Sequence, residues 1–313
     1  MLVFLFRRIA AGAVLVVVVA TATFLLLNLT GTDVARNVLG ETASRSAVTA
    51  KSHELGLDQP LVERYWHWVE QAAQGNLGSS WFTGDSVNQS LMDTLPVTLS
   101  VVLTGLLIAA VLSVALGAAA ALRGGWVDRA VQFAAVLGTA VPSFLIALVL
   151  VVTLAVQLGW LPATGYVALG TSATDWFRSI ILPAVSLAVA ATAATAMQVR
   201  GAMIDVLRAD FVRTLRSRGL STRSVVFKHA LRNAAPPALT VIALQFIGLI
   251  SGAVVVEKVF GLPGIGTLAN SAAVRGDAPV LLGTVVVTVG IVVAVNLLLD
   301  IAYGWLNPKV RVS

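Results

Sequence analysis

Six long apolar segments without any Asp, Glu, Lys or Arg are the feature that most constrains how this chain can fold. A helix that crosses a bilayer needs about 20 mostly apolar residues. The segments that meet this requirement are Ile9–Leu29, Val97–Leu122, Ala130–Leu158, Ile180–Val199, Ala234–Val256 and Pro279–Leu299. The sequence therefore predicts an all-α integral membrane protein with six transmembrane helices.

The composition agrees with this prediction and excludes several other classes of protein. The chain is 58% hydrophobic and 12% charged, whereas a soluble domain has roughly 25% charged residues. Its net charge of +6 could suggest a nucleic-acid partner. However, the basic residues lie between the apolar segments, where the positive-inside rule already accounts for them, so we expect no nucleic acid. The chain has no cysteine, which excludes disulfides, thiolate metal sites and cysteine nucleophiles.

The first apolar segment has an alternative interpretation as a signal peptide. Arg7 and Arg8 precede it, and Ala20-Thr21-Ala22 resembles a cleavage site. Hydrophobic residues continue through Leu27, beyond any such cut. We therefore predict a retained transmembrane helix within residues 1–29.

The distribution of charge predicts the orientation of the chain in the membrane. Of the 21 Lys and Arg residues, 14 fall in four segments that we place inside: 1–8, 123–129, 200–233 and 300–313. Seven basic residues, together with 11 of the 15 acidic ones, fall in three segments that we place outside: 30–96, 159–179 and 257–278. Because basic residues near span ends stay in the cytoplasm, we expect both termini there.

The largest outside segment, 30–96, has a helical pattern of its own. Between Ser44 and Ala73, six residues lie roughly on one helical face: Leu55, Leu57, Leu61, Tyr65, Trp68 and Val69. The tryptophans Trp66, Trp68 and Trp81 suit either the membrane interface or a partner surface. We divide the chain into an N-terminal helix (1–29), an extracytoplasmic loop (30–96) and a five-helix core (97–313).

Motifs for catalysis and nucleotide binding are absent from the sequence. No stretch matches G-x-x-x-x-G-K-[ST], and none of the four lysines follows a glycine. The three histidines, His53, His67 and His229, are too scattered for a metal cluster, and neither H-E-x-x-H nor G-x-S-x-G occurs. We therefore expect no catalytic residue, metal or cofactor in this chain.

The polar residues inside the spans are all neutral. Ion-coupled carriers usually place ionisable groups there, although each costs about 2.5–3.5 kcal/mol on insertion scales. Gln198, Gln245 and Asn296 are candidates to line an uncharged pathway. Alternatively, they form hydrogen bonds between helices, worth about 0.6 kcal/mol on average. A transporter with such a pathway needs an external energy source; a secondary carrier or channel is the alternative from another class.

The segment 200–233 predicts a basic hairpin on the cytoplasmic side. It carries eight Lys/Arg and two acidic residues, and its apolar residues are at helical spacing as far as Ser217. Gly219 can end that helix in a left-handed conformation, and Ser221 can cap a following helix over Thr222–Asn233. We expect Pro236-Pro237 near the first turn of the fifth span. The hairpin is either a docking surface or a surface loop without a partner.

One stretch of this hairpin resembles a known motif. FVRTLRSRGLSTRSVVFKHALRNAAPP (Phe211–Pro237) resembles the EAA-type coupling motif of binding-protein-dependent ABC importer permeases. It is most similar to the B-type permease subunit of dipeptide, oligopeptide and nickel importers. Four further segments share the resemblance: Leu55–Ser80, Gly252–Leu268, Arg275–Gly283 and Asn296–Arg311. Leu215, Ser217 and Arg218 stand where the family usually has Ala, Ala and Lys, whereas Gly219 is retained.

The resemblance implies a fold, a function and a set of partners. The fold would be the type I ABC importer permease (MetI-like) fold, in the bacterial plasma membrane. The function would be ATP-driven import of peptides or, alternatively, of nickel, glutathione or another small solute. The partners would be a homologous second permease, two ATP-binding cassette subunits that bind the ATP and Mg, an extracytoplasmic substrate-binding protein, and membrane lipid.

The resemblance also implies roles for individual residues of the hairpin. Gly219 would form the turn, Leu220, Val225 and Val226 would supply apolar contact to the ATPase, and the basic side chains would supply charge. These four residues belong to the expected coupling set, the residues that would contact the ATPase. The set also contains Thr214, Ser221 and the basic residues Arg213, Arg216, Arg218 and Arg223.

A glycine-rich stretch follows the fifth span and contains Gly261, Pro263, Gly264 and Gly266. No strand is expected before it, so it does not fit a nucleotide-binding loop. We expect a re-entrant turn that borders the outer mouth of the pathway, with an ordinary connector as the alternative.

Overall fold

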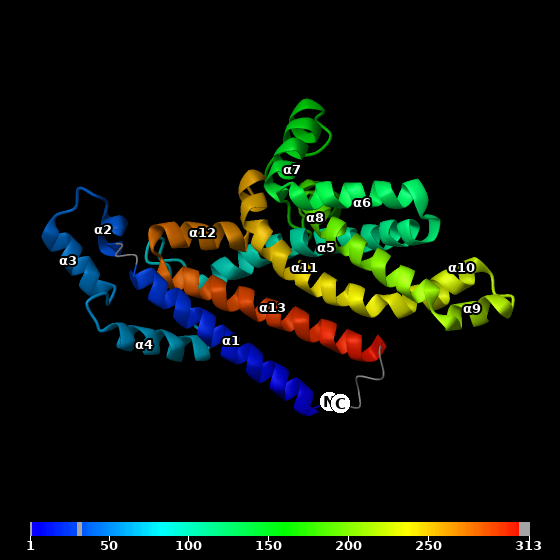
Figure 1. The fold of residues 1–313 in the computed structure, drawn as a ribbon. Helices are drawn as coiled ribbons and strands as arrows, with labels where there is room; N and C mark the ends of the chain where they lie inside the picture. The colour runs from blue at the N-terminus through cyan, green and yellow to red at the C-terminus, as the bar shows by residue number, and fades with distance from the viewer. Residues whose placement is uncertain (1, 30–32, 307–313) are drawn as a thin grey trace. The chain divides into compact units, whose positions relative to one another are not determined.

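The computed structural model describes residues 2–29 and 33–306, and these residues are almost entirely helical (Figure 1). Residues 307–313, which belong to the expected inside segment 300–313, lie outside the described part. An isolated antiparallel bridge joins Ser79 to Ser86. The helices of the first part of the chain are α1 (Leu2–Leu29), α2 (Val34–Leu39), α3 (Arg45–Glu54), α4 (Leu61–Ala73), α5 (Val87–Arg123), α6 (Gly125–Ala140), α7 (Ser143–Leu150) and the π-helix η1 (Val151–Gln157). They are followed by α8 (Ala173–Arg208), α9 (Asp210–Ser217), α10 (Thr222–Ser224), the π-helix η2 (Val225–Ala230), α11 (Leu231–Val259), α12 (Ile265–Arg275) and α13 (Ala278–Leu306).

Five helical stretches among the described residues are long and apolar enough to cross a membrane, or six if one bent pair forms a single span. The five coincide with the first, second, fourth, fifth and sixth predicted segments. All five begin earlier than predicted, by the largest margins α5 at Val87, α8 at Ala173 and the stretch that leads into α11 at Thr222. Hydropathy marks only the apolar part of a helix, whereas backbone hydrogen bonding continues through polar residues. Because α5 starts at Val87, Pro96 lies inside this helix and not before it.

The third predicted span, Ala130–Leu158, is not one continuous helix. It is divided between α6 and α7–η1, which are bent by 96° at the break. Val141 has extended backbone angles (φ −88°, ψ 120°), and Pro142 follows it. A proline disfavours the helical conformation of the residue before it and has no N–H to donate, which explains the position of the break. The predicted segment thus counts as a span only as a bent pair of helices, and not as one continuous helix.

The fifth span also begins differently from the prediction. η2 runs directly into α11, so Pro236 and Pro237 lie inside a continuous helical stretch from Thr222 to Val259. Side-chain hydrogen bonds supplement the backbone around the prolines: Asn233 Nδ2 donates to the His229 carbonyl at 2.8 Å, and Thr240 Oγ1 donates to the Pro236 carbonyl at 3.3 Å. Local π-helical adjustment, as in η2 just before these prolines, is one way in which membrane helices tolerate proline.

The chain forms two compact units, and each is described by itself. The first comprises Met1–Val97 and Pro263–Ala294. Its hydrophobic cluster joins α5, α12 and α13 through Val87, Leu91, Ile265, Ala272 and Val280. The buried Asp277 carboxylate accepts hydrogen bonds from Ser80 Oγ at 2.5 Å and from the Trp81 backbone N–H at 3.2 Å. These bonds fix the loop before α5 to the start of α13.

The second unit comprises Thr98–Leu262 and Val295–Ser313, and α8 lies at its centre. This helix contacts α6, α7 and α11, and about two thirds of the residues in its most apolar stretch are buried. Its buried face is rich in alanine, including Ala184, Ala188 and Ala196. Small side chains let membrane helices approach closely, so α8 can serve as the packing centre of this unit.

Candidate functional site

The hairpin predicted at 200–233 begins as a direct extension of α8. That helix continues through Arg208, and the chain then bends at Ala209, whose backbone is extended (φ −66°, ψ 148°). The helix α9 follows over Asp210–Ser217. The predicted helical character as far as Ser217 is therefore confirmed, with one interruption that the spacing of apolar residues did not indicate.

The turn at Gly219 has the geometry of a helix stop. Gly219 adopts φ +81°, a conformation that glycine reaches without the strain other residues meet. The Gly219 N–H donates to the Arg216 carbonyl at 2.9 Å, and the Leu220 N–H donates to the Leu215 carbonyl at 3.2 Å. This pair of bonds is a Schellman motif, which satisfies carbonyls that α9 leaves free at its end. The predicted left-handed turn is confirmed.

The return arm of the hairpin starts at Ser221, as predicted. The Ser221 hydroxyl accepts a hydrogen bond from the Ser224 N–H at 3.3 Å, which caps the new helix. That helix then passes through η2 into α11 without a break. The return arm is thus the first part of a candidate membrane span, so a force on the turn would act directly on that span.

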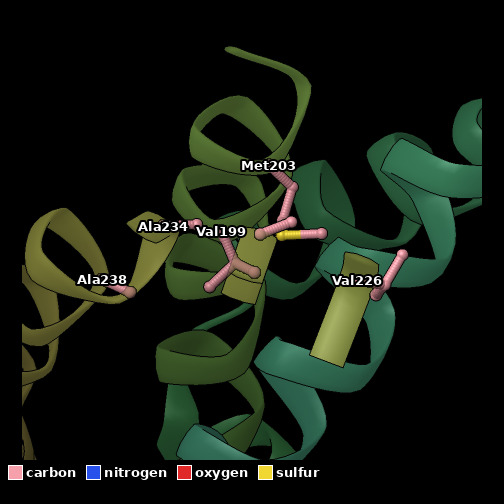
Figure 2. Packing of buried hydrophobic residues seen from close by; sticks show 6 residues of the cluster. Val199, Met203, Val226, Ala234 and Ala238 are labelled. Carbon is pink, nitrogen blue, oxygen red and sulfur yellow. The ribbon is translucent and has the colours of Figure 1, made fainter. Parts of the chain in front are cut away.

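An anchor cluster holds the return arm against α8. It consists of six buried residues: Val199, Met203, Val226, Ala230, Ala234 and Ala238. Figure 2 shows Val199 and Met203 close to Val226 and Ala234. Met203 is fully buried. Burying a valine- or methionine-sized side chain contributes about 1.5–3 kcal/mol, so several such residues hold the base of the hairpin firmly.

The burial of two valines on the return arm corrects part of the predicted coupling set. We expected Val225 and Val226 to supply apolar contact to an ATPase, but they are 0% and 4% exposed. Their side chains pack inside this chain and cannot form a contact surface. Leu220 is half-buried and the only one of the three predicted apolar contacts that reaches the surface. Helical spacing alone could not reveal this, because it does not say which face of the return arm meets α8.

The exposed face of the hairpin is basic. Arg213, Arg216, Arg218 and Arg223 are exposed, as are Thr214, Gly219 and Ser221. Arg213 lies 3.6 Å from Asp210, but both side chains are more than four fifths exposed, so this ion pair contributes little. The surface therefore presents a concentrated positive charge around the turn.

Two exposed aromatic residues on the hairpin were missed by the sequence reasoning. Phe211 is 40% exposed and Phe227 is 66% exposed. Phe227 directly follows the buried Val226. The apolar run Val225–Phe227 is therefore divided between the buried face and the exposed face of the return arm. An aromatic residue among exposed arginines is a typical anchor of a protein–protein interface. The location of Phe211 and Phe227 in the basic segment 200–233 was the signal that could have identified them.

A bidentate ion pair fixes the start of the hairpin. Arg200 Nη2 donates to Asp128 Oδ2 at 2.6 Å, and Arg200 Nε donates to the other carboxylate oxygen. Asp128 lies in the first turn of α6, so this pair joins α6 to α8. The paired geometry is the strong form of an arginine–carboxylate interaction. The two residues are 72 positions apart, which is why the sequence did not suggest their pairing.

The predicted pathway residues lie on three different helices. Gln198 is exposed on α8, directly before Val199 of the anchor cluster. Gln245 on α11 and Asn296 on α13 are half-buried. Their role in a pathway stays a prediction.

The glycine-rich stretch after the fifth span forms a helix end and a helix start. Gly261 has φ +58°, and the Leu262 N–H donates to the Glu257 carbonyl at 2.8 Å, which ends α11 in a second Schellman motif. Gly264 precedes α12, and Gly266 is buried in its first turn, with Pro263 between the two helices. The stretch is thus an ordered connection between α11 and α12. Its role as an outer gate stays a prediction.

Comparison with known families identifies the family of this chain. Residues 113–312 match the family described as binding-protein-dependent transport system inner membrane component, and residues 1–102 match the N-terminal region of such membrane components. The chain belongs to this family. It is therefore a permease subunit of an ABC importer, a multi-pass protein of the inner membrane, and a transporter component rather than an enzyme.

Individual relatives match the permease over nearly its whole length. It is 38% identical over 310 residues to a probable peptide ABC transporter permease protein of Sinorhizobium fredii, covering 99% of both chains. It is 40% identical over 306 residues to a putative peptide transport system permease protein of Brucella abortus, covering 97% of this chain and 98% of the relative. It is 34% identical over 312 residues to a glutathione transport system permease protein of Salmonella typhi, covering 99% of both. The predicted six-span permease class is confirmed by these matches and by the apolar helices.

Proposed function

We propose that this permease is the membrane-spanning subunit of an ATP-driven peptide importer. It forms half of a translocation pathway, and a homologous second permease forms the other half. The names of the relatives from Sinorhizobium fredii and Brucella abortus support a peptide as the solute. Neutral polar residues within the spans, such as Gln245 and Asn296, suit a solute whose side chains vary.

The hairpin is the part of the permease that receives the force of ATP hydrolysis. The observation that carries this proposal is that the return arm runs without a break into α11, while the anchor cluster packs this arm against α8. Closure of a partner ATPase against the basic turn around Gly219 would move two spans at once. The pathway would then alternate between two states that nucleotide binding biases.

The remaining partners follow from the orientation that we propose. With both termini in the cytoplasm, the basic hairpin faces two ATP-binding cassette subunits, which bind the ATP and Mg. The loop 30–96 then faces an extracytoplasmic substrate-binding protein. The excess of Lys and Arg in the segments placed inside supports this orientation.

Glutathione is the second candidate solute. The relative from Salmonella typhi is named for glutathione, and glutathione is itself a tripeptide. A pathway without ionisable groups would conduct either solute, so the choice between them would fall to the substrate-binding protein.

Reconstitution of the complete complex in liposomes tests the proposed function. We expect uptake of a labelled peptide that depends on ATP inside and on a binding protein outside, with glutathione as the parallel solute. The isolated permease should hydrolyse no ATP, because it has no phosphate-binding loop. ATP turnover by the isolated chain, or solute uptake that follows an ion gradient without ATP, would contradict the proposal.

A further inference from the structure

The helix α4, from the loop that follows the first span, packs against the side of that span. Tyr65 Oη lies 2.5 Å from Thr21 Oγ1 of α1, within hydrogen-bond distance, and the Tyr65 ring lies against Phe24 with the centroids 5.2 Å apart. Arg64 Nη1 donates to Asn28 Oδ1 at 3.3 Å, and the guanidinium lies 5.9 Å from the centre of the Phe24 ring. These contacts cover the last two turns of α1, and all of them lie in the first compact unit.

The positions of these contacts along α1 place α4 at the depth of lipid. Thr21 is eight residues before the end of α1 at Leu29, or about 12 Å at 1.5 Å per residue. The apolar stretch Phe6–Leu29 has 24 residues, about 36 Å, so it exceeds a hydrocarbon core of about 30 Å by roughly 3 Å at each end. With α1 centred in the bilayer and parallel to its normal, the Tyr65 hydroxyl lies about 9 Å below the edge of the hydrocarbon. Interfacial helices bury their apolar faces to a similar depth, about 5–10 Å.

The outer surface of α4 carries two stripes of different character. Val62 and Trp66 are 67% and 64% exposed, and with Val69 and Ala73 they form an apolar stripe at helical spacing. Glu63, His67 and Glu70 are exposed and form a polar stripe. At 100° per residue the two stripes are centred about 100° apart, as on a helix that lies in a membrane surface.

We propose that α4 lies in the membrane interface at the Leu29 end of α1, with its apolar stripe against lipid and its polar stripe against water. A water-soluble partner does not suit the apolar stripe, because the contacts with Thr21 and Phe24 hold α4 below the hydrocarbon edge. Lipid also covers the neighbouring face of α1, where Leu25, Leu26 and Leu29 are exposed. The proposal depends on α1 being a span and not on which solute the importer carries.

Site-directed spin labelling tests this proposal, since the chain has no native cysteine. Single cysteines replace Val62 or Trp66 on the apolar stripe and Glu63 or Glu70 on the polar stripe, each in the complete complex in liposomes. Collision rates are measured with oxygen, which concentrates in lipid, and with a water-soluble nickel chelate.

We expect labels at Val62→Cys and Trp66→Cys to collide more with oxygen than with nickel, and labels at Glu63→Cys and Glu70→Cys to show the reverse. Greater collision with nickel at 62 and 66 would mean that α4 stands in water and would overturn the proposal. Low collision with both reagents at 62 and 66 would mean that protein covers the stripe and would overturn it equally. Uptake of solute by the labelled complexes, measured in parallel, shows that the assembly is intact.

Discussion

The backbone N–H of Leu220 donates a hydrogen bond to the carbonyl of Leu215 at 3.2 Å, across the left-handed turn at Gly219. This bond fixes the angle at which α9 turns back into the helix that becomes α11. The turn itself is exposed, whereas the base of the hairpin is held by buried residues of α8 and the return arm. The hairpin therefore has a rigid base and a tip that is free to bind a partner.

Met203→Ala tests the importance of the anchor cluster for stability. Met203 is fully buried, so its truncation leaves a cavity and should cost about 2–5 kcal/mol of unfolding free energy. We expect a lower thermal midpoint for the purified complex and reduced accumulation in the membrane. Met92→Ala is the matched control, because Met92 is 73% exposed, and its effect should stay within about 0.5 kcal/mol. Equal stability of the two variants would contradict the packing described here.

Phe227→Ala tests whether the exposed aromatic residue binds the ATPase. Loss of an aromatic anchor typically costs about 2 kcal/mol of binding free energy, or roughly 30-fold in affinity. Because Phe227 is 66% exposed, the permease should insert and accumulate normally. We expect the ATPase subunits to dissociate more readily during purification. The control is Phe177→Ala, a 50% exposed phenylalanine at the start of α8; if both variants retain the ATPase equally, Phe227 is not an anchor.

The ion pair between Asp128 and Arg200 should be detectable by a double-mutant cycle. Asp128→Asn and Arg200→Gln each remove one charge of a bidentate pair that joins α6 to α8. We expect each single variant to lower the thermal midpoint, and the double variant to be more stable than the sum of the single effects predicts. Strict additivity of the two effects would show that the pair contributes no interaction energy.

The short-range features of the hairpin could be predicted from the sequence. Gly219 and Ser221 have distinctive backbone and side-chain chemistry, so their roles as turn and helix cap followed from local rules. The broken third span had a local signal too, in Pro142, but the continuous hydrophobicity of its surroundings outweighed it in the prediction. Hydropathy reports how apolar a segment is and not whether its backbone stays straight.

Features that depend on packing could not be predicted. The burial of Val225 and Val226 depends on which face of the return arm meets α8. Val225, Val226 and Phe227 are consecutive apolar residues that point in different directions from the helix, so the sequence does not show which of them is buried. The Asp128–Arg200 pair depends on contact between helices far apart in the chain. The proposed roles of Gln198, Gln245 and Asn296 depend on the second permease, so this chain alone does not define them.

Accessibility of single cysteines tests the proposed orientation. Ser79→Cys and Ser217→Cys both place the thiol at an exposed position. In whole cells, a membrane-impermeant maleimide should label Ser79→Cys, and it should label Ser217→Cys only after the membrane is opened. Labelling of Ser217→Cys in intact cells would place the hairpin outside and would remove the basis for its contact with ATPases.

Gly219→Val tests the central claim that the hairpin transmits the force of ATP hydrolysis. A side chain at position 219 would meet open space, so the substitution acts through backbone strain alone, on the order of 1–3 kcal/mol. The strain falls on an exposed turn, and the anchor cluster stays intact, so the variant should accumulate normally. Gly219→Asn is the matched control, because asparagine tolerates the left-handed conformation better than valine does.

The decisive measurement is solute uptake together with ATP hydrolysis by the reconstituted complex of each variant. For Gly219→Val at normal membrane levels, we expect uptake to be lost and ATP hydrolysis to be no longer stimulated by the loaded binding protein, whereas Gly219→Asn retains most of both. Uptake by Gly219→Val equal to that of the unmodified permease would show that the turn is an incidental surface loop and would contradict the account.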